Sequence, residues 1–327
     1  MTRTVRLDFK TLPSTVAAYP SALFGKKPLL APAGIEMPTI EVCASRVAVS
    51  RSHVARYRAV CGIPEATFLP PAYLHVLAMP LHMRIFTADA FPVKVLGLVH
   101  LRNVIRQRRA IPVDELLEIT AGFAESRETD SGQEYDIFTR GVSRGVQVWE
   151  EISTMLARRH TPGKRPTIDR LPADVDAAER RCQIKVEGDT GRCYAFVSGD
   201  VNPIHLWDFT ATRFGFKQAV AHGMWSLART LGEVADVLPT GAMQVDTQFK
   251  LPLYLPGDAV VTNWKRTDQN GPWMDLWLSD GRKGRPHLAM QVREAGKSGS
   301  QEGRKPDDLN CSLASATSAT SAASMLP

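Results

Sequence analysis

Apolar and polar positions along this chain repeat with the periods of helices and of strands. In residues 224–238, MWSLARTLGEVADVL, apolar side chains recur at helical spacing: Leu227, Leu231, Val234, Ala235 and Leu238. This segment precedes several extended stretches, the last of which is 286–294, PHLAMQVRE. A helix followed by three or four long strands predicts an α+β fold in which an antiparallel sheet wraps around the helix.

Turn signals divide the extended stretches. Asn270-Gly271 lies between VVTNWKRT and WMDLWLS and predicts a two-residue hairpin, and DSG at 130–132 occupies the matching place in the first half. The first half also ends on a strand-like stretch, 146–156, VQVWEEISTML. Its helix pattern contains Pro80, so that helix is expected to be kinked or to start later.

The sequence contains one internal repeat. YRAVCG at 57–62 matches YAFVSG at 194–199, and AYLHVLAM at 72–79 falls where VAHGMWSL at 220–227 falls. VIRQRRAIPVDE at 104–115 likewise matches QFKLPLYLPGDA at 248–259. Because the matches keep their order, we predict two similar domains in tandem.

Composition sets the domain boundaries. Residues 161–180 are polar and rich in proline, which is typical of a linker. From residue 296 the chain is dominated by Ser, Ala, Thr and Gly and cannot bury enough apolar surface to offset the entropy of ordering. The expected organisation is an N-terminal domain over 1–160, a linker over 161–180, a C-terminal domain over 181–295 and a disordered tail over 296–327.

Bulk properties exclude several classes of protein. The 327 residues are 44% hydrophobic, with no apolar run that could span a bilayer and no secretory signal at the N-terminus. Five cysteines without a CxxC pair suit a reduced, cytoplasmic protein. A net charge of +6 favours anionic ligands, but no nucleic-acid-binding motif is present, so no nucleic-acid partner is expected.

The densest basic stretch is RNVIRQRRA at 102–110. On a strand Arg102, Arg106 and Arg108 would share one face. Such a face is ordinarily the solvated side of a sheet, and a phosphate-binding role is the alternative.

Residues 194–224 concentrate reactive groups in one polar break between apolar segments. Asp200 and His205 flank Pro203, which restricts the backbone, and Gly199 allows a positive φ. A carboxylate and an imidazole brought together by such a loop can hold a water and transfer its protons. His222-Gly223 then precedes the helix, where backbone N–H groups are unpaired. Taken singly, each element also fits an ordinary turn or helix start.

The motif Ser198-Gly199-Asp200-x-Asn202-Pro203-x-His205, with GF and AHGM downstream, resembles the signature of MaoC-like (R)-specific enoyl-CoA hydratases. The resemblance implies tandem hot-dog domains (a double hot dog). It implies hydration of trans-2-enoyl thioesters to (R)-3-hydroxyacyl thioesters, or the reverse dehydration, without metal or cofactor. The substrate would be an acyl-CoA or an acyl carrier protein thioester.

The resemblance also implies roles for individual residues. Asp200 and His205 would be catalytic, and the Gly223 amide would stabilise the thioester oxyanion. The supporting residues would be Tyr194, Ser198, Gly199, Asn202, Pro203 and His222. The substrate-binding candidates are Phe214, Phe216, Met224, Trp225, Arg106 and Lys250, of which the aromatic ones are core residues by default.

The first half lacks this loop. IPEATF follows YRAVCG, without Asp, Asn-Pro or His at the matching places, and Val76 stands where the second half has Gly223. His75 corresponds to His222, and Arg106 corresponds to Lys250. The first half is therefore expected to widen the acyl tunnel, with Arg106 available for phosphates of the carrier.

Two alternatives stay open at this level. A hot-dog thioesterase would not need the Asp-Asn-Pro-His loop. A non-catalytic acyl-thioester-binding or partner subunit would share the fold but would not need the Asp/His pair. Chain length, carrier, direction, and the choice between monomer and homodimer are not determined by the sequence.

Overall fold

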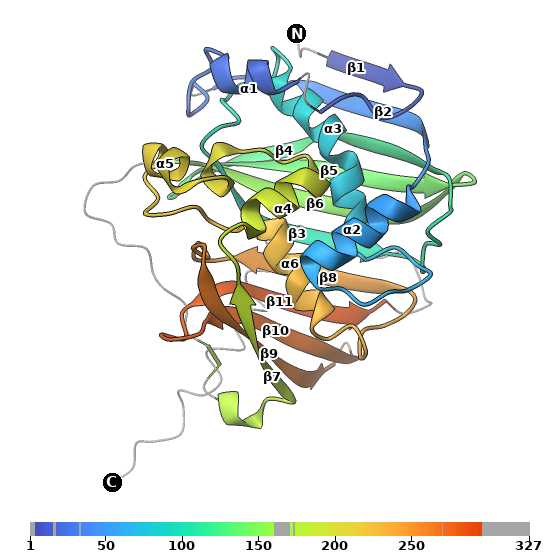
Figure 1. Ribbon diagram of the computed structural model, residues 1–327. Helices are drawn as coiled ribbons and strands as arrows, with labels where there is room; N and C mark the ends of the chain where they lie inside the picture. Colours follow the sequence, from blue (N-terminus) through green and yellow to red (C-terminus); the bar gives the residue numbers. More distant parts are fainter. Residues whose placement is uncertain are drawn as a thin grey trace.

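The computed structural model describes residues 4–15, 18–32, 34–159, 171–172, 174–269 and 271–295. Its strands form one eleven-stranded sheet in the order β1-β2-β4-β5-β6-β3-β8-β11-β10-β9-β7 (Figure 1). The strands are β1 (Thr4–Phe9), β2 (Thr39–Val47), β3 (Leu98–Gln107), β4 (Leu117–Thr129), β5 (Gly132–Ser143), β6 (Val146–Arg158), β7 (Arg180–Val186), β8 (Met243–Phe249), β9 (Gly257–Asp268), β10 (Gly271–Asp280) and β11 (Pro286–Glu294).

The sheet consists of two five-stranded halves with the same strand order. The order β2-β4-β5-β6-β3 in the first half is repeated as β7-β9-β10-β11-β8 in the second, and β1 adds a parallel strand at the outer edge. Antiparallel pairing of β3 with β8, in which Arg102 lies opposite Gln248, joins the halves into one sheet. The fold is therefore a tandem pair of hot-dog units, as the internal repeat predicts.

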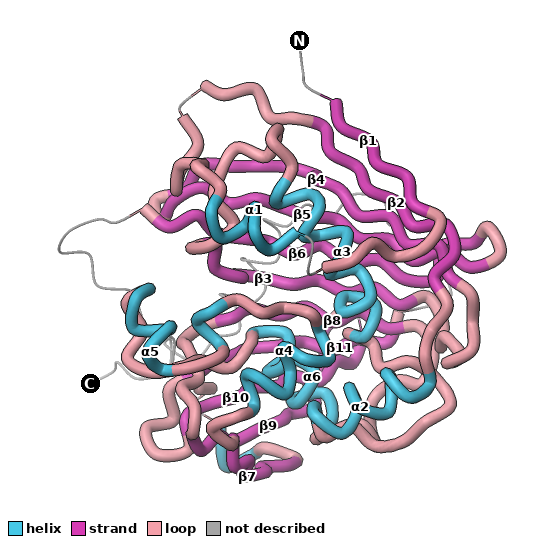
Figure 2. The backbone as a smooth tube through the Cα atoms, turned by 45° about the horizontal axis from the view of Figure 1, so that its top comes forward, coloured by secondary structure: helices cyan, strands magenta, loops and turns pink. Residues whose placement is uncertain are grey.

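The helices lie together on one face of this sheet (Figure 2). They are α1 (Tyr19–Phe24), α2 (Arg51–Cys61), α3 (Tyr73–Thr87), α4 (Thr190–Ser198), α5 (Asp208–Ala211) and α6 (Gly223–Gly232), with short 3₁₀ turns η2 (Val175–Ala177), η3 (Pro203–His205) and η4 (Thr212–Phe214). Helices α3 and α6 are the central helices of the two halves, and eleven residues of α3 are buried. The indole N–H of Trp225 in α6 donates to the Val60 carbonyl in α2, at 2.9 Å, and ties the halves together.

The repeated YRAVCG and YAFVSG segments have the same local structure. Each forms the end of a helix, α2 or α4, and each final glycine is the C-cap with positive φ, 62° for Gly62 and 73° for Gly199. Glycine adopts this left-handed conformation without the steric cost that a Cβ would add. The two sequence matches thus mark the same structural event in each half.

Two expectations about the central helices need correction. The predicted helix over 224–238 ends at Gly232. Gly232 packs closely on the first half, since a Cβ there would lie 2.8 Å from the Gly62 carbonyl oxygen. Val234 is nevertheless fully buried. Helix α3 begins at Tyr73 and continues through Pro80, so the later start is wrong, and the alternative of a kink at Pro80 stays a prediction. Packing of nearly its whole circumference compensates for the hydrogen bond that proline removes.

The expected hairpins form. Thr129 pairs with Gly132 at the end of the β4–β5 ladder, and Asp268 pairs with Gly271 at the end of the β9–β10 ladder. Most of the predicted linker and the whole of the predicted tail (296–327) lie outside the described residues. The domain boundaries stay a prediction. Among the described residues, no helix is long and apolar enough to cross a membrane.

Substitution of a core leucine tests the role of the central helix. Leu227 is completely buried in α6, so Leu227→Ala is expected to lower the free energy of unfolding by about 2–5 kcal/mol through lost burial and the cavity left behind. Urea unfolding measures the change. The same substitution at Leu116, which is 48% exposed, should change it by less than about 0.5 kcal/mol. Equal effects at both positions would contradict this packing.

Candidate active site

The loop after α4 is shaped by its own side chains. Gly199 ends the helix, and the Asp200 N–H donates to the Ser198 hydroxyl at 3.1 Å. The Asn202 N–H in turn donates to Oδ1 of Asp200 at 3.1 Å, and the Asn202 side chain caps the 3₁₀ turn η3. Pro203 occupies the first position of that turn, where its fixed φ is favourable. The sequence Ser-Gly-Asp-x-Asn-Pro therefore folds the chain back within a few residues.

His205, at the end of η3, is fixed by its backbone and its ring. Its Nδ1 lies 2.7 Å from the Val220 carbonyl oxygen, so Nδ1–H donates and Nε2 keeps its lone pair. The His205 carbonyl packs over Gly191, where a Cβ would lie only 1.9 Å away. The imidazole stacks on that of His222, with ring centroids 3.7 Å apart. The ring is held in one orientation with one nitrogen available as a base.

Asp200 lies beside these two rings. Polar side-chain atoms of Asp200, His205 and His222 are within 4.8 Å of one another. His222 Nε2 donates to the Asp200 carbonyl at 3.0 Å and is 3.8 Å from Oδ2, while the Tyr194 ring packs against His222 at 4.9 Å. The Asp200 side chain is 30% exposed. The three groups therefore form one compact cluster, with His222 in a supporting position.

The charges of the cluster follow from burial and proximity. Burial favours the neutral acid of Asp200, but the neighbouring His222 and His205 outweigh it and lower the pKa of the carboxyl. Burial also lowers the pKa of His205, although Asp200 opposes this shift. At neutral pH the pair is therefore a carboxylate next to a neutral imidazole, the protonation states that a general base needs.

Gly223 begins α6 directly after His222. The first N–H groups of a helix have no intrahelical acceptor, and the helix dipole places partial positive charge there. A Cβ on Gly223 would lie 3.1 Å from the Phe249 ring, so the residue must be small for the ring to keep its place. Gly223 is thus a suitable donor to an oxygen in the space beside it.

That space is a cavity of about 1330 Å³ lined by both halves of the protein. Among the sequence-predicted residues, it is lined by Tyr194, Ser198, Asp200, Asn202, His205, Phe216, His222, Gly223, Met224 and Lys250. The first half contributes the apolar residues Met79, Met83, Phe86, Val95 and Leu96. The cluster of Asp200, His205 and His222 therefore lies at the wall of a large, partly apolar cavity.

Three predicted substrate-binding residues do not line this cavity. Phe214 is 41% exposed, and Trp225 is a core residue whose indole bonds to Val60. Arg106 projects from β3 to Gln244, at 3.1 Å, and to Glu150, at 3.7 Å. Arg108 lies at the same distance from Glu150, which fits the solvated face of a sheet. The structure brings Arg106 to this paired surface cluster and not to the cavity.

Tyr19 was not predicted from the sequence, although it holds the loop. Its hydroxyl donates to the Gly199 carbonyl at 2.7 Å and accepts from the Val201 N–H at 2.8 Å. It comes from α1 and is separated from the loop by 180 residues. No local pattern around Tyr19 signals this contact, so only the folded chain could reveal it.

Asp200, His205 and His222 also have ligand types that suit a divalent metal ion. In the described geometry, however, His222 Nε2 is bonded to the Asp200 carbonyl and His205 Nδ1 to that of Val220. Nε2 of His205 and the carboxylate of Asp200 are then available, and Nδ1 of His222 is buried without a hydrogen-bond partner among the described residues. The lone pair of His205 Nε2 and the Asp200 carboxylate can hold a water between them.

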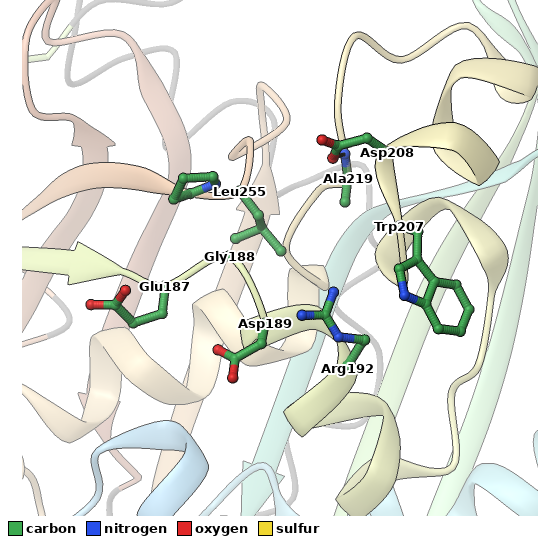
Figure 3. Close-up of a pocket in the computed structure, with 9 residues that line it drawn as sticks. Glu187, Gly188, Asp189, Arg192, Trp207, Asp208, Ala219 and Leu255 are labelled. Carbon is green, nitrogen blue, oxygen red and sulfur yellow. Dashed lines mark hydrogen bonds between the residues drawn. The ribbon is translucent and has the colours of Figure 1, made fainter.

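A second, more open pocket of about 550 Å³ lies nearby (Figure 3). It is lined by Glu187, Gly188, Asp189, Arg192, Trp207, Asp208, Ala219, Leu255 and Pro256. Arg192 is bonded to the Leu206 carbonyl at 2.9 Å, on the backbone that continues from His205. Neither Asp200 nor His205 lines this pocket, so it is separate from the Asp200–His205 cluster.

Removal of the Tyr19 hydroxyl tests its hold on the loop. In Tyr19→Phe the Gly199 carbonyl and the Val201 N–H lose their partner, so hydrogen exchange of the Val201 amide should become at least about 10-fold faster. Tyr73→Phe is the matched control, because it removes a buried hydroxyl that bonds to His53 instead. Unchanged exchange at Val201 in Tyr19→Phe would refute the positioning role.

Acid should destabilise the protein through its buried histidines. Burial lowers the pKa of His82, His100 and His222 from 6.5 to about 3. Between these values the unfolded chain binds more protons than the folded chain, so the free energy of unfolding should fall as pH is lowered from 6.5 towards 3. His75, whose pKa is raised above 6.5, is protonated in both states below pH 6.5 and adds no slope there. Burial raises the pKa of Asp275 from 3.8 to about 6, so this carboxyl opposes the trend.

Urea unfolding between pH 7 and 4 measures this dependence. His82→Gln should flatten the slope, because it removes one of the groups that must be protonated on unfolding. A free energy of unfolding that rises on acidification would contradict the expected sign.

Comparison with known proteins agrees with this architecture. Residues 174–272 match the family described as MaoC like domain. The 3-hydroxyacyl-thioester dehydratase X of Mycobacterium tuberculosis is 31% identical over 293 residues, which cover 86% of this chain and 99% of that relative.

Solved structures extend the similarity. A crystal structure of HtdX of Mycobacterium tuberculosis has a TM-score of 0.66 at 27% identity and covers 78% of this chain and 100% of its own. A MaoC-like dehydratase from Phytophthora capsici shares the fold, with a TM-score of 0.63 at 15% identity over 83% of this chain and 97% of its own. Since the 31% identical relative matches along nearly its whole length, the chain belongs to the MaoC-like dehydratase family.

Proposed function

We propose that the protein catalyses the reversible hydration of trans-2-enoyl thioesters to (R)-3-hydroxyacyl thioesters. The observation that carries the proposal is the cluster of Asp200 and His205 at the wall of the large cavity, with the start of α6 at the same wall. Membership of a dehydratase family and a relative named 3-hydroxyacyl-thioester dehydratase support it. The (R) configuration rests on the resemblance of the loop motif.

Asp200 and His205 act on one water in this proposal. The carboxylate accepts a hydrogen bond from the water and orients it, and the unprotonated Nε2 of His205 takes a proton as the oxygen bonds to C3. The same proton, or its equivalent, is returned to C2, so the elements of one water are added across the double bond. Such acid–base catalysis contributes typically ~10²–10⁴-fold to a rate.

The Gly223 amide stabilises the charge that develops on the thioester oxygen as C3 is attacked. A preorganised donor of this kind is worth ~10²–10³-fold, because it needs no reorganisation during the reaction. The apolar part of the cavity, from Met79 to Phe86, then accommodates the acyl chain. Coenzyme A and an acyl carrier protein both fit as carriers.

Removal of the carboxylate charge tests the acid–base pair. Asp200→Asn should lower kcat for hydration of crotonyl-CoA by about 10²–10⁴-fold, because the amide cannot orient and accept from water in the same way. The loss of the enoyl thioester absorbance measures the rate. Asp236→Asn, which changes a surface aspartate paired with Arg180, should stay within about 2-fold. If native protein and Asp200→Asn are equally inert on enoyl-CoA substrates with short and long chains, the proposed activity is wrong and the alternative of a non-catalytic binding subunit is favoured.

A proline at position 223 tests the oxyanion donor. His222 has φ −64° and ψ 141°, a conformation that suits a residue before proline, so Gly223→Pro removes the N–H with a backbone that the helix start allows. Its Cβ lies against the Phe249 ring, as that of alanine also does. Gly223→Ala is the matched variant, since it adds the same Cβ but keeps the donor. We expect kcat of Gly223→Pro to be about 10²–10³-fold lower than that of Gly223→Ala. Equal rates for the two variants would remove Gly223 from this role.

A further inference from the structure

A second set of titratable side chains faces the same cavity from the first half of the protein. His75 and His82 of α3 and His100 of β3 line the cavity together with Asp200 and His205. Glu151 of β6 lies behind them, with its carboxylate 2.9 Å from Nδ1 of His75. We refer to His75, His82, His100 and Glu151 as the inner histidine cluster. The proposed acid–base chemistry uses none of them.

His75 and Glu151 form a buried ion pair. Burial opposes the charge on each, but their mutual attraction prevails, so the pKa of His75 is raised and that of Glu151 is lowered. The Asn103 amide also donates to Glu151, at 2.5 Å. Since Nδ1–H of the imidazolium is used by Glu151, its second N–H, at Nε2, is a further donor.

His100 has the opposite character. Burial, with the positive charge of His75, lowers its pKa to about 3, so its imidazole is neutral. Its hydrogen bond to the backbone at Arg102 favours the protonated ring, as a carbonyl acceptor does. His100 Nε2 is buried and has no hydrogen-bond partner among the described residues, so the backbone bond is made by Nδ1–H. Nε2 is then an unsatisfied acceptor.

The two rings lie side by side. The His75 and His100 centroids are 6.0 Å apart and the ring planes differ by 21°. A donor and a buried acceptor thus occur on neighbouring rings of two residues that line the cavity. A hydroxyl group meets both needs with one oxygen, because it donates and accepts. A keto oxygen or a carboxylate would leave His100 without a donor, and a methylene chain would satisfy neither ring.

The cluster lies between the candidate active site and the apolar part of the cavity. His100 packs on the Phe249 ring at 4.7 Å, and that ring adjoins Gly223. Along the face of α3 that lines the cavity, His75 is followed by the apolar residues Met79, Met83 and Phe86, with His82 between the two methionines. An acyl chain that extends from Gly223 into the apolar region would therefore pass the inner histidine cluster.

We propose that the inner histidine cluster binds a hydroxyl group carried by the acyl chain, in addition to the oxygen at C3. The preferred substrates are then hydroxylated acyl thioesters, with His75 as donor and His100 as acceptor. This inference rests on the proposed hydratase function, because it takes the acyl chain to lie in this cavity.

The test compares trans-2-enoyl-CoA substrates of equal length, either unsubstituted or with one hydroxyl at successive positions from C5 outward. One position should raise kcat/KM by about 10-fold or more over the unsubstituted chain, as a site built to hydrogen-bond a hydroxyl requires. In His100→Phe this ratio should fall to about one or below, and His100→Gln, which restores an acceptor, should recover part of it. His53→Phe, a histidine substitution outside the cavity lining, should leave the ratio unchanged.

Equal kcat/KM for the unsubstituted chain and for every hydroxylated chain would overturn the inference, since the cluster would then hold water only. The same holds if His100→Phe leaves the preference intact. Absence of turnover on all substrates would instead refute the proposed function. In that case, the affinities of the native protein for hydroxylated and unsubstituted acyl-CoA test whether the inner histidine cluster binds a hydroxyl group. Equal affinities would contradict that binding.

Discussion

The stacking of His205 on His222 is the interaction on which the candidate site depends. Two imidazoles can lie with centroids 3.7 Å apart only if they are not both charged, and burial lowers the pKa of each ring. Each ring is also fixed by a backbone carbonyl, that of Val220 for His205 and that of Asp200 for His222. The stack therefore orients the His205 base and anchors the loop that carries the carboxylate.

The two halves of the protein share one fold but differ in the loop that carries the candidate catalytic residues. Strand order, central helix and the C-cap glycines are the same in both, but only the second half has the Asp-Asn-Pro-His loop. The first half contributes Tyr19, which bonds to that loop, and much of the cavity wall. The proposed reacting groups, Asp200 and His205, come from one half, while both halves line the cavity.

The sequence predicted that Asp200 and His205 lie together, because the two residues are close along the chain. Asp200, Asn202 and His205 fold together through local hydrogen bonds, so their spacing carries the information. The hairpins were predictable for the same reason, and the tandem repeat was predictable because its matching segments keep their order in the two halves. Long-range contacts were not: Tyr19 reaches the loop across 180 residues, and Trp225 bonds to the opposite half.

The orientation of the charged strand that carries Arg106 and Arg108 could not be predicted from the sequence either. Period-2 alternation correctly groups Arg106 and Arg108 on one face, but it does not say which face meets the cavity. Glu150 and Glu151 are adjacent on one strand, so their side chains point to opposite faces of the sheet and one of them must point inward. Glu151 is that residue, and its pairing with His75 depends on the packing of α3 over β6.

The stereochemistry of addition tests the central claim most directly. Because Asp200 and His205 lie together, with their polar atoms within 4.8 Å, oxygen and proton should reach the double bond from the same side. Hydration of crotonyl-CoA in D₂O, followed by NMR of the product, reports the relative configuration at C2 and C3. A syn product with deuterium at C2 and (R) configuration at C3 is expected. An anti product would contradict the action of both groups on one water.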